Sequence, residues 1–399
     1  MPSLKRYFSG LSANTFFLAF ASFFADISTE MLYPVLPVFL TQTLGASASV
    51  VGLVEGIAQA IQNVVQAFSG WLSDKLQLRK PVALIGYALA AVSKPLIGLS
   101  TFWPAVLGAR SLDRLGTGIR SAPRDALIAA SANESDRGKA FGLEGIGDNL
   151  GAFVGPLIAV VLLTLLQVNI RSIFFLAIIP GLLAMLMVLL VRERPISGPV
   201  KVKLDLSIRR FPKGYWTYLF STALFGIGNS SNSFLILRTT DRGASLTATI
   251  LIYTFFNLVA AIASYPAGYL SDKLGRKRIL LCSFLIFVVV YAGFGLATDV
   301  VLIAGLFLLY GLYQGMFRSV GKAFATDFLP AELRASGVGW YTATVGLSGL
   351  VANIVGGELW TRVAPSATFF YGAACALLGS SALVLFVRQK HEGTSALTR

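Results

Sequence analysis

The sequence predicts an all-α membrane protein of twelve transmembrane helices, arranged as two related bundles of six. Three observations support this fold class. Hydrophobic residues make up 55% of the 399-residue chain and charged residues only 13%, whereas a soluble domain carries roughly 25% charged residues. Long apolar runs alternate with short polar segments along the whole chain. One loop sequence in the first half reappears 198 residues later.

Each apolar run is long enough to cross a bilayer as a helix, because the hydrocarbon layer is spanned by about 20 helical residues. Backbone polar groups cannot stay unpaired in lipid, so only helices or a closed barrel can span it. Barrel strands are alternating segments of about 10 residues, and these runs are longer and do not alternate. In chain order the predicted helices cover residues 12–40, 47–71, 81–100, 103–124, 138–165, 171–191, 215–237, 246–270, 279–297, 300–322, 335–357 and 366–387.

The basic residues follow the predicted topology. A formal charge of +14 could suggest a nucleic-acid partner. If the N-terminus is cytoplasmic, however, the inner segments together with the inner ends of the helices hold 26 of the 33 Lys and Arg residues, which is the positive-inside pattern. We therefore expect a multi-pass protein of a prokaryotic inner membrane, with both termini in the cytoplasm. The excess of basic residues is then explained by the topology of the chain in the lipid bilayer, and we expect no nucleic-acid partner.

The sequence offers little material for metal, redox or ATP chemistry. Cys282 and Cys375 lie in apolar runs and are expected to be buried free thiols. His391, in the tail, is the single histidine, so no His/Cys metal cluster can be built. No phosphate-binding G-x-x-x-x-G-K-[ST] loop occurs. We expect no metal, no cofactor and no enzymatic activity. The first apolar run is too long for a cleavable signal peptide.

A basic polar stretch divides the chain into two domains. Residues 192–213 contain seven Lys and Arg residues and are predicted to form a cytoplasmic linker that lies against anionic lipid heads. The predicted N-terminal bundle is 1–191. The predicted C-terminal bundle is 214–399 and ends in a short cytoplasmic tail.

The two halves are related in sequence. The run Gly-Trp-Leu-Ser-Asp-Lys at 70–75 returns as Gly-Tyr-Leu-Ser-Asp-Lys at 268–273. The pair Arg120-Ser121 returns as Arg318-Ser319, again 198 residues later. A repeat this long indicates two homologous halves. Since each half has an even number of spans, the copies share one orientation and are related by an axis along the membrane normal.

The repeated loop carries a recognisable signature. Its second copy matches the pattern G-x-x-x-D-x-x-G-[RK]-x-[RK] in full, at Gly268, Asp272, Gly275, Arg276 and Arg278. The first copy keeps Gly70 and Asp74 but has Gln77 and Leu78 in place of the second glycine and the first base. With this loop at two equivalent positions, the chain resembles the major facilitator superfamily over its whole length. The resemblance implies the fold of that superfamily and a transport function.

Two further motifs refine the resemblance. In the fifth span Gly142, Gly151, Gly155 and Pro156 match the spacing of the antiporter motif of exporters in this superfamily, although Ala159 and Val160 replace its last two glycines. Export by antiport is therefore favoured over uptake by symport. In the fourth span, residues 110–118 partly resemble the R-x-x-Q-G-x-G motif, with Asp113 in the glutamine place and Arg114 in that of the first glycine.

The repeated loops are predicted to work as a conformational latch. A carboxylate at a helix end can bind the free N–H groups of a neighbouring helix start. By resemblance, the latch stabilises the outward-open state; the alternative is a loop that only fixes topology. The predicted latch residues are Gly70, Asp74, Arg79, Gly268, Asp272, Arg276, Arg120 and Arg318.

Charged residues at membrane depth are the main functional candidates, because a charge at the bilayer centre costs roughly 2.5–3.5 kcal/mol on insertion scales. Opposite charges can offset one another, and a carboxylate left over could bind and release a proton. The leading candidates for proton coupling are Asp26 and Glu55, followed by Asp113, Asp148, Glu144 and Glu30. Central charge pairing is assigned to Arg110, Arg114 and Lys94. The alternative is a set of closed ion pairs that only hold helices together.

The second half has fewer deep charges and more neutral polar and aromatic residues. We expect it to recognise the substrate, although core packing is the more frequent role of any one aromatic residue. A polar stripe in the second span adds to the predicted cavity. The cavity and substrate candidates are Gln59, Gln62, Asn229, Asn232, Asn257, Tyr310, Tyr313, Gln314, Trp340, Tyr341 and Asn353.

The sequence thus predicts a monomeric, secondary active transporter of a small organic solute that works by alternating access and is coupled to protons. Uptake of a metabolite, an organic anion or a metal chelate by symport remains the alternative direction. A membrane sensor on the same fold is the rival from another class. No appended soluble domain supports the sensor.

Overall fold

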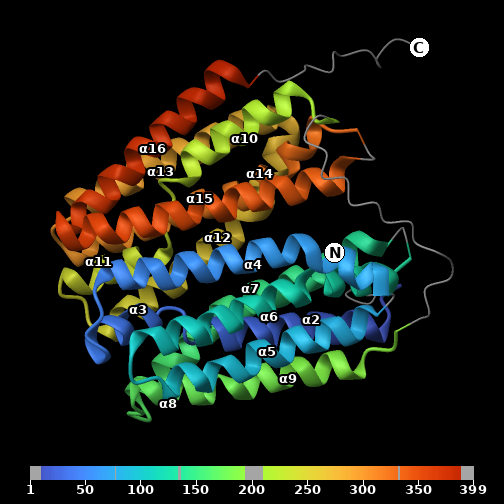
Figure 1. Cartoon of the computed structure of the whole chain (residues 1–399), viewed down its shortest axis with the longest axis horizontal. Helices are drawn as coiled ribbons and strands as arrows, with labels where there is room; N and C mark the ends of the chain where they lie inside the picture. The colour runs from blue at the N-terminus through green and yellow to red at the C-terminus, as the bar shows by residue number, and fades with distance from the viewer. Residues whose placement is uncertain (1–9, 77, 134–135, 194–209, 331–332, 388–399) are drawn as a thin grey trace, which may run out of the picture.

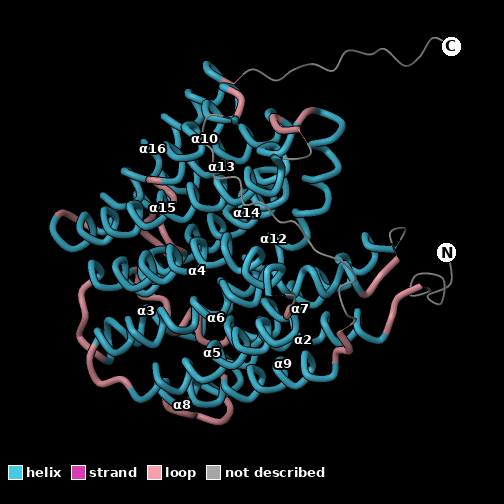
Figure 2. The backbone as a smooth tube through the Cα atoms, turned by 45° about the vertical axis from the view of Figure 1, so that its right-hand side comes forward, coloured by secondary structure: helices cyan, strands magenta, loops and turns pink. Residues whose placement is uncertain are grey.

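The computed structural model describes residues 10–76, 78–133, 136–193, 210–330 and 333–387, without the side chains of Trp71, Asp74 and Ala335. Most of the predicted linker and the predicted tail, with His391, lie outside the described residues. All regular secondary structure in the described part is helical, as Figure 2 shows. The chain is an all-α membrane protein.

Both halves consist of long helices packed side by side (Figure 1). The first half contains α2 (Ala13–Glu30), α3 (Leu36–Val38), the π-helix η1 (Phe39–Thr43), α4 (Ala48–Leu76), α5 (Arg79–Leu99), α6 (Trp103–Ala130), α7 (Arg137–Thr164), α8 (Ile170–Leu176) and α9 (Ile178–Leu190). The second half contains α10 (Lys213–Gly226), α11 (Asn232–Asp241), α12 (Leu246–Leu274), α13 (Arg276–Leu296), α14 (Val300–Asp327), α15 (Arg334–Arg362) and α16 (Pro365–Phe386).

These helices account for the twelve predicted spans. Within the described residues, nine helical segments are long and apolar enough to cross a bilayer, with α8 and α9 counted as one. The other three predicted spans do not meet this criterion of length and hydrophobicity, and the structure shows why. The first and the seventh are interrupted, at 31–35 and at 227–231. The fourth, α6, is continuous but carries a series of buried charges.

The interruptions are a difference from the sequence prediction of straight spans. Both occur at nearly the same place in the two halves, since Tyr33 and Ser231 are 198 residues apart. The tyrosine hydroxyl and the serine hydroxyl are hydrogen-bonded at 3.0 Å. The broken spans therefore meet each other at equivalent positions of the repeat.

The glycine of the loop signature has a conformational reason. Gly275 ends α12 and begins α13 with a φ of 95°, a value that is readily adopted only by glycine. The chain can therefore reverse its direction between α12 and α13 with a single residue between the two helices. Gln77, at the equivalent place of the first half, lies outside the described residues.

Small residues bring α7 against α2. A Cβ atom at Gly147, Gly151 or Gly155 would lie 2.5 to 2.8 Å from a backbone oxygen of α2, closer than real atoms approach. Glycine at every fourth position thus lets the two backbones touch along one face. This contact places the acidic residues of α7 next to those of α2.

The outer surface of the helices is apolar. Cys375 is buried, as expected, but the expectation of a buried thiol is wrong for Cys282, which is exposed. It shares a face of α13 with exposed Leu285 and Val289, because residues three and four positions apart lie on the same side of a helix. This face suits contact with lipid rather than the protein core.

Candidate functional site

The two halves meet over one part of their length. We call the side that holds the described chain ends and residues 191–193 the terminal side, and the opposite side, with the loops 44–47, 100–102 and 165–169, the far side (right and left in Figure 1). At the far side, the Ser49 hydroxyl is 2.9 Å from the Thr361 hydroxyl and 3.1 Å from the Gly357 carbonyl oxygen. Next to them, a Cβ on Gly52 would collide with the Asn353 carbonyl of α15. The far side is therefore closely packed.

A polar cavity of about 90 Å³ lies between the halves, near the middle of the helices. That volume admits several water molecules. Helices α2 and α7 of the first half and α11, α12 and α14 of the second half surround it. Its polar lining consists of Asp26, Glu30, Asn149, Asn232, Tyr253, Asn257, Ser264, Gln314 and Arg318.

The first half contributes two carboxylates to this cavity. Glu30 accepts a hydrogen bond of 3.0 Å from the hydroxyl of Tyr253 in the second half. Asp26, one turn earlier on α2, makes no hydrogen bond or ion pair with any described residue. It interacts electrostatically with Asp148, Arg120, Glu30 and Arg124. Asp26 is thus a carboxylate beside a polar space without a direct partner.

The second half contributes amides and one guanidinium group. Asn257 donates across the interface to the carbonyl of Ala152, at 3.2 Å. Asn232 accepts from the Tyr310 hydroxyl at 2.9 Å. Gln314 and Arg318 lie one turn apart on α14, and both line the cavity. The cavity thus combines two carboxylates, one cation and several amides from opposite halves.

A buried charge network fills the interior of the first half. The Arg110 side chain binds Glu55 at 3.1 Å and Asp113 at 2.9 Å. Lys94 binds the other oxygen of Asp113 at 3.0 Å. Arg114 lies 3.7 Å from Asp113 and donates to the Gln62 amide oxygen at 3.1 Å. Glu55 and Asp113 are therefore held by cations, in the closed arrangement that the sequence left open as an alternative.

A second network lies nearer the terminal side. Arg124 is 2.8 Å from Glu144, 3.1 Å from Asp125 and 3.8 Å from Asp148. Ser22 of α2 donates to Glu144 at 3.1 Å. From the sequence, central charge pairing was assigned to Arg110, Arg114 and Lys94, and Arg124 was not named as the partner of these acids. The residues come from different helices, so helical spacing could not reveal the pairing.

Most of the remaining aromatic candidates lie in the core of the second half. Tyr310 and Tyr313 have ring centroids 5.2 Å apart and stack among other buried rings, and Asn229 interacts with Tyr313. Trp340 contacts Trp216, and Tyr341 stacks on Tyr218 at 6.1 Å. These residues are absent from the lining of the described cavity.

The remaining amide candidates support helix contacts. Asn353 binds the backbone N–H of Ser231, at 2.8 Å, and so steadies the break before α11. Gln59 donates to Asn63 on its own helix at 3.2 Å. Asn63 in turn lies where any side chain on Gly346 of α15 would collide with it. Asn63 therefore lies on the face of α4 that packs against the second half, whereas Gln62 is bound to Arg114 of the first half.

The predicted latch residues occupy different places. Arg276 binds Asp272 at 3.3 Å and also pairs with Asp327 at the end of α14, so this contact stays within the second half. Arg318 lines the cavity, and Arg120 is buried over the ring of Tyr87, 4.4 Å from its centroid. Gly268 has open space around it, whereas Gly70 faces Ala122. The Asp74 side chain lies outside the described residues.

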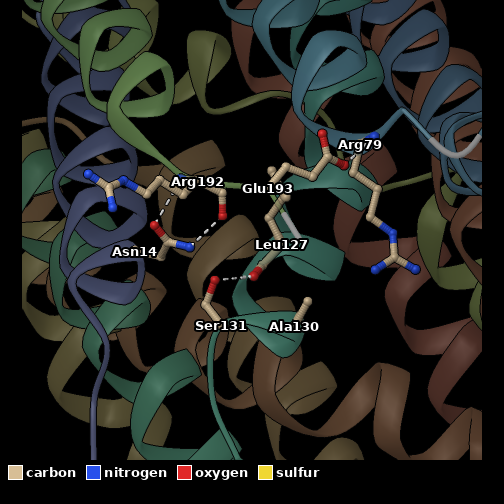
Figure 3. Close-up of a pocket in the computed structure, with 7 residues that line it drawn as sticks. All are labelled: Asn14, Arg79, Leu127, Ala130, Ser131, Arg192 and Glu193. Carbon is tan, nitrogen blue, oxygen red and sulfur yellow. Dashed lines mark hydrogen bonds between the residues drawn. The ribbon is translucent and has the colours of Figure 1, made fainter. Parts of the chain in front are cut away.

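At the terminal side of the first half, the start of α5 is bound by Glu193, which was not among the residues predicted from the sequence. The two Glu193 carboxylate oxygens accept from the backbone N–H groups of Arg79 and Lys80, at 2.9 and 3.2 Å. Asn14 makes two hydrogen bonds to the backbone of Arg192 (Figure 3). These contacts line a small pocket and fasten the segment after α9 to the bundle.

Comparison with known proteins agrees with this architecture. The family model described as Major Facilitator Superfamily matches residues 18–236 and 218–398. The MFS-type transporter MJ1317 of Methanocaldococcus jannaschii is 34% identical over 383 residues, covering 94% of this chain and 95% of that protein. The multidrug resistance protein MdtH of Photorhabdus laumondii is 29% identical over 151 residues, 37% of this chain and 36% of that protein.

Solved structures share the fold. The nucleoside transporter NupG superposes with a TM-score of 0.75 at 15% sequence identity, covering 93% of this chain and 98% of that one. At this identity the likeness speaks for the fold alone. Together with the family match over nearly the whole length, it identifies the chain as a membrane transporter that belongs to the major facilitator superfamily.

Proposed function

We propose that this protein is a proton-coupled secondary transporter that moves a small polar solute by alternating access, and that it is not an enzyme. The observation that carries the proposal is the cavity between the halves, with Asp26 unpaired on one wall and Arg318 and amides on the other. Secondary transporters of this architecture bind their substrates between the repeats near the midplane. The lining of the cavity by residues of both halves supports this proposal.

Asp26 is the group we assign to proton coupling. Glu55 and Asp113 are locked to buried cations at 2.9 to 3.1 Å, so protonating either would leave a cation without its partner. Asp26 has no such bond and lines a space that admits water. A proton can therefore reach and leave it without breaking an ion pair. Glu30 is the second candidate, since its hydrogen bond to Tyr253 joins the two halves.

The direction we propose is export by proton antiport. The glycine motif of α7 and the similarity to a multidrug resistance protein over 37% of the chain both favour it. Uptake by symport is the alternative. We place the terminal side in the cytoplasm of a prokaryotic inner membrane, from the distribution of Lys and Arg, and we expect a monomer. In this orientation the closed far side is extracellular and the structure is an inward-facing state.

The test is transport by the purified protein in proteoliposomes. A thermal-shift screen against metabolites, metal chelates and drugs first finds a ligand, and its flux is then followed under an imposed pH gradient. Antiport predicts that the solute moves against the direction of the proton gradient. Movement with the gradient would establish symport instead. Binding without flux would leave a sensor as the better description.

A further inference from the structure

The cavity between the halves carries opposite charges on opposite walls. Glu30 of α2 and Arg318 of α14 both line it, and they interact electrostatically. Neither makes an ion pair with the other or with a further residue in the described part of the chain. Two opposite charges that line one space without touching can each bind a different end of the same occupant.

Close packing of α14 on α12 fixes the position of Arg318. A Cβ on Gly315 would lie 2.6 Å from the carbonyl oxygen of Ala260, so the two backbones touch at this point. One turn later, the Ser319 hydroxyl donates to the carbonyl oxygen of Ser264 at 2.9 Å. The turn of α14 that carries Arg318 is therefore held between two contacts with its neighbour.

The internal repeat shows that Arg318 has a different environment from its counterpart. Arg120 stands 198 residues earlier at the equivalent position. It is buried inside the first half, with its guanidinium over the ring of Tyr87. Arg318 is exposed and lines the cavity instead. Its five N–H donors make no hydrogen bond to any described residue, so they are available to water or to a solute.

Glu30 also has unused capacity. Its Oε2 atom accepts the hydrogen bond of Tyr253, and this is the one hydrogen bond that Glu30 makes with the described residues. A carboxylate offers about four acceptor positions. Arg110 and Arg114 act on Glu30 electrostatically, but both use their hydrogen bonds inside the buried charge network of the first half. Glu30 can therefore accept further hydrogen bonds from a cationic group in the cavity.

We propose that the solute bound in this cavity is a small zwitterion, whose carboxylate binds Arg318 and whose ammonium group binds Glu30. The proposal rests on the transport function proposed above and leaves Asp26 for the proton. A guanidinium group can bind a carboxylate through two parallel hydrogen bonds. An ammonium group has three donors and no acceptor, which complements the free positions of Glu30.

Charge and size narrow the solute further. The described lining holds one cation, Arg318, against the carboxylates of Asp26 and Glu30. A singly charged carboxylate suits it better than a phosphate group, which carries about −1.5 to −2 charges at pH 7. Gln314 also lines the cavity, makes no hydrogen bond with a described residue, and can bind the carboxylate beside Arg318. A space of about 90 Å³ suits two charged groups joined by a short carbon chain.

The first test measures binding to the purified full-length protein without a proton gradient. The probes are glycine, β-alanine, γ-aminobutyrate and δ-aminovalerate, in which the carbon chain between the two charges grows step by step. Each is compared with its N-acetyl derivative, which lacks the positive charge, and with its amide, which lacks the negative charge. Since a ligand of the folded state raises its stability, we expect at least one zwitterion to raise Tm saturably by about 2–4 °C. Its two derivatives should bind about tenfold or more weakly.

Two variants assign the charges to the residues. Arg318→Gln should weaken binding of the zwitterion about tenfold or more and make it equal to that of the amide. Glu30→Gln should weaken it similarly and make it equal to that of the N-acetyl derivative. Glutamine can still accept the hydrogen bond of Tyr253, so this contact between the halves is kept. Arg171→Gln and Glu358→Gln, which change charges at the far side, are the matched controls and should bind as wild type does.

The proposal would be overturned if none of the four zwitterions bound wild type, or if a zwitterion and its N-acetyl derivative bound equally well. A preference for the zwitterion over its amide that persists in Arg318→Gln would also contradict it. These results do not depend on proton coupling. In proteoliposomes, pH-driven flux of a solute that lacks one of the charges would contradict the zwitterion and leave proton-coupled transport standing. Binding of a zwitterion without flux would contradict the transport function and support the assignment of the ligand.

Discussion

At the scale of single residues, Asp26 differs from Glu55 and Asp113 in having space beside it and no bound cation. The buried acids Glu55 and Asp113 each contact at least one cation within 3.1 Å. A group that exchanges protons during a transport cycle needs access to water, and an ion-paired group must first lose its partner. The two kinds of acid should therefore respond differently to neutralisation.

We expect Asp26→Asn to abolish transport driven by a pH gradient, with a loss of about tenfold or more, while substrate binding stays within a factor of about three. The measurement is flux in proteoliposomes beside a binding assay. Asp299→Asn is the matched control, because Asp299 caps α14 by binding the N–H of Leu302 and asparagine caps equally well. Full gradient-driven flux in Asp26→Asn would remove this residue from the coupling role.

Asp113→Asn should act mainly on stability. It leaves Lys94 and Arg110 without their shared carboxylate, and breaking a buried ion pair by removing one partner costs about 3–5 kcal/mol. The loss should be visible as a large fall in the unfolding midpoint in detergent. Adding Lys94→Met removes one stranded charge and should recover part of the loss. A single variant as stable as wild type would show that the network is not a structural support.

The sequence identified the deep charges but not their pairing. Glu55 and Arg110 are 55 residues apart, and Arg124 reaches Glu144 from a different helix. Helical spacing indicates which residues share a face, and it contains no information on which faces of distant helices meet.

At the scale of elements, the glycines of α7 form a contact surface with α2. Gly151→Ala should destabilise the protein by about 1–3 kcal/mol, because its Cβ would meet the Phe23 carbonyl at 2.5 Å and the Asp26 side chain at 2.8 Å. Gly142 belongs to the same sequence motif but has open space around it. Thermal unfolding of the two alanine variants compares them directly.

The Gly142→Ala variant should match or exceed wild-type stability, since alanine favours a helix over glycine by about 1 kcal/mol. If it keeps its stability yet loses transport, the motif has a gating role in addition to packing. Equal stability of both variants would contradict the packing argument for Gly151.

The helix breaks were the elements least accessible to prediction. Apolar composition continues through 31–35, so the first span was predicted as one helix over 12–40, although Tyr33 precedes Pro34, a setting that disfavours helical backbone. In the second half, the polar run Asn229-Ser230-Ser231 is the corresponding indication of a helix break. The long uninterrupted helices, in contrast, were predicted, most of them from length and hydrophobicity alone.

At the scale of the whole molecule, the two halves are joined at the far side. Alternating access requires this contact to open when the terminal side closes. Ser49→Cys with Thr361→Cys, in a background with Cys282 and Cys375 replaced by alanine, should form a disulfide, because the native hydroxyls are 2.9 Å apart. Flux should fall to background when oxidised and return on reduction.

The single cysteine variants are the controls, and they should transport at the same rate with or without oxidant. If the cross-linked protein transports at the full rate, the far side does not need to open and the rocking of the two halves is excluded.

The same proteins test which side of the membrane the far side faces. A membrane-impermeant thiol reagent should reach a single cysteine at Ser49 only from the outside of intact cells in the outward-facing state.

The contact between Tyr33 and Ser231 has a consequence for the origin of the molecule. Positions that correspond in a duplicated chain meet only on the axis that relates the copies. In an ancestor built from two identical six-helix chains, this residue would have touched its own counterpart, as in any isologous dimer. A tyrosine and a serine now meet at this place, with their hydroxyls 3.0 Å apart. Fusion of the genes would have allowed the two positions to diverge into a complementary pair.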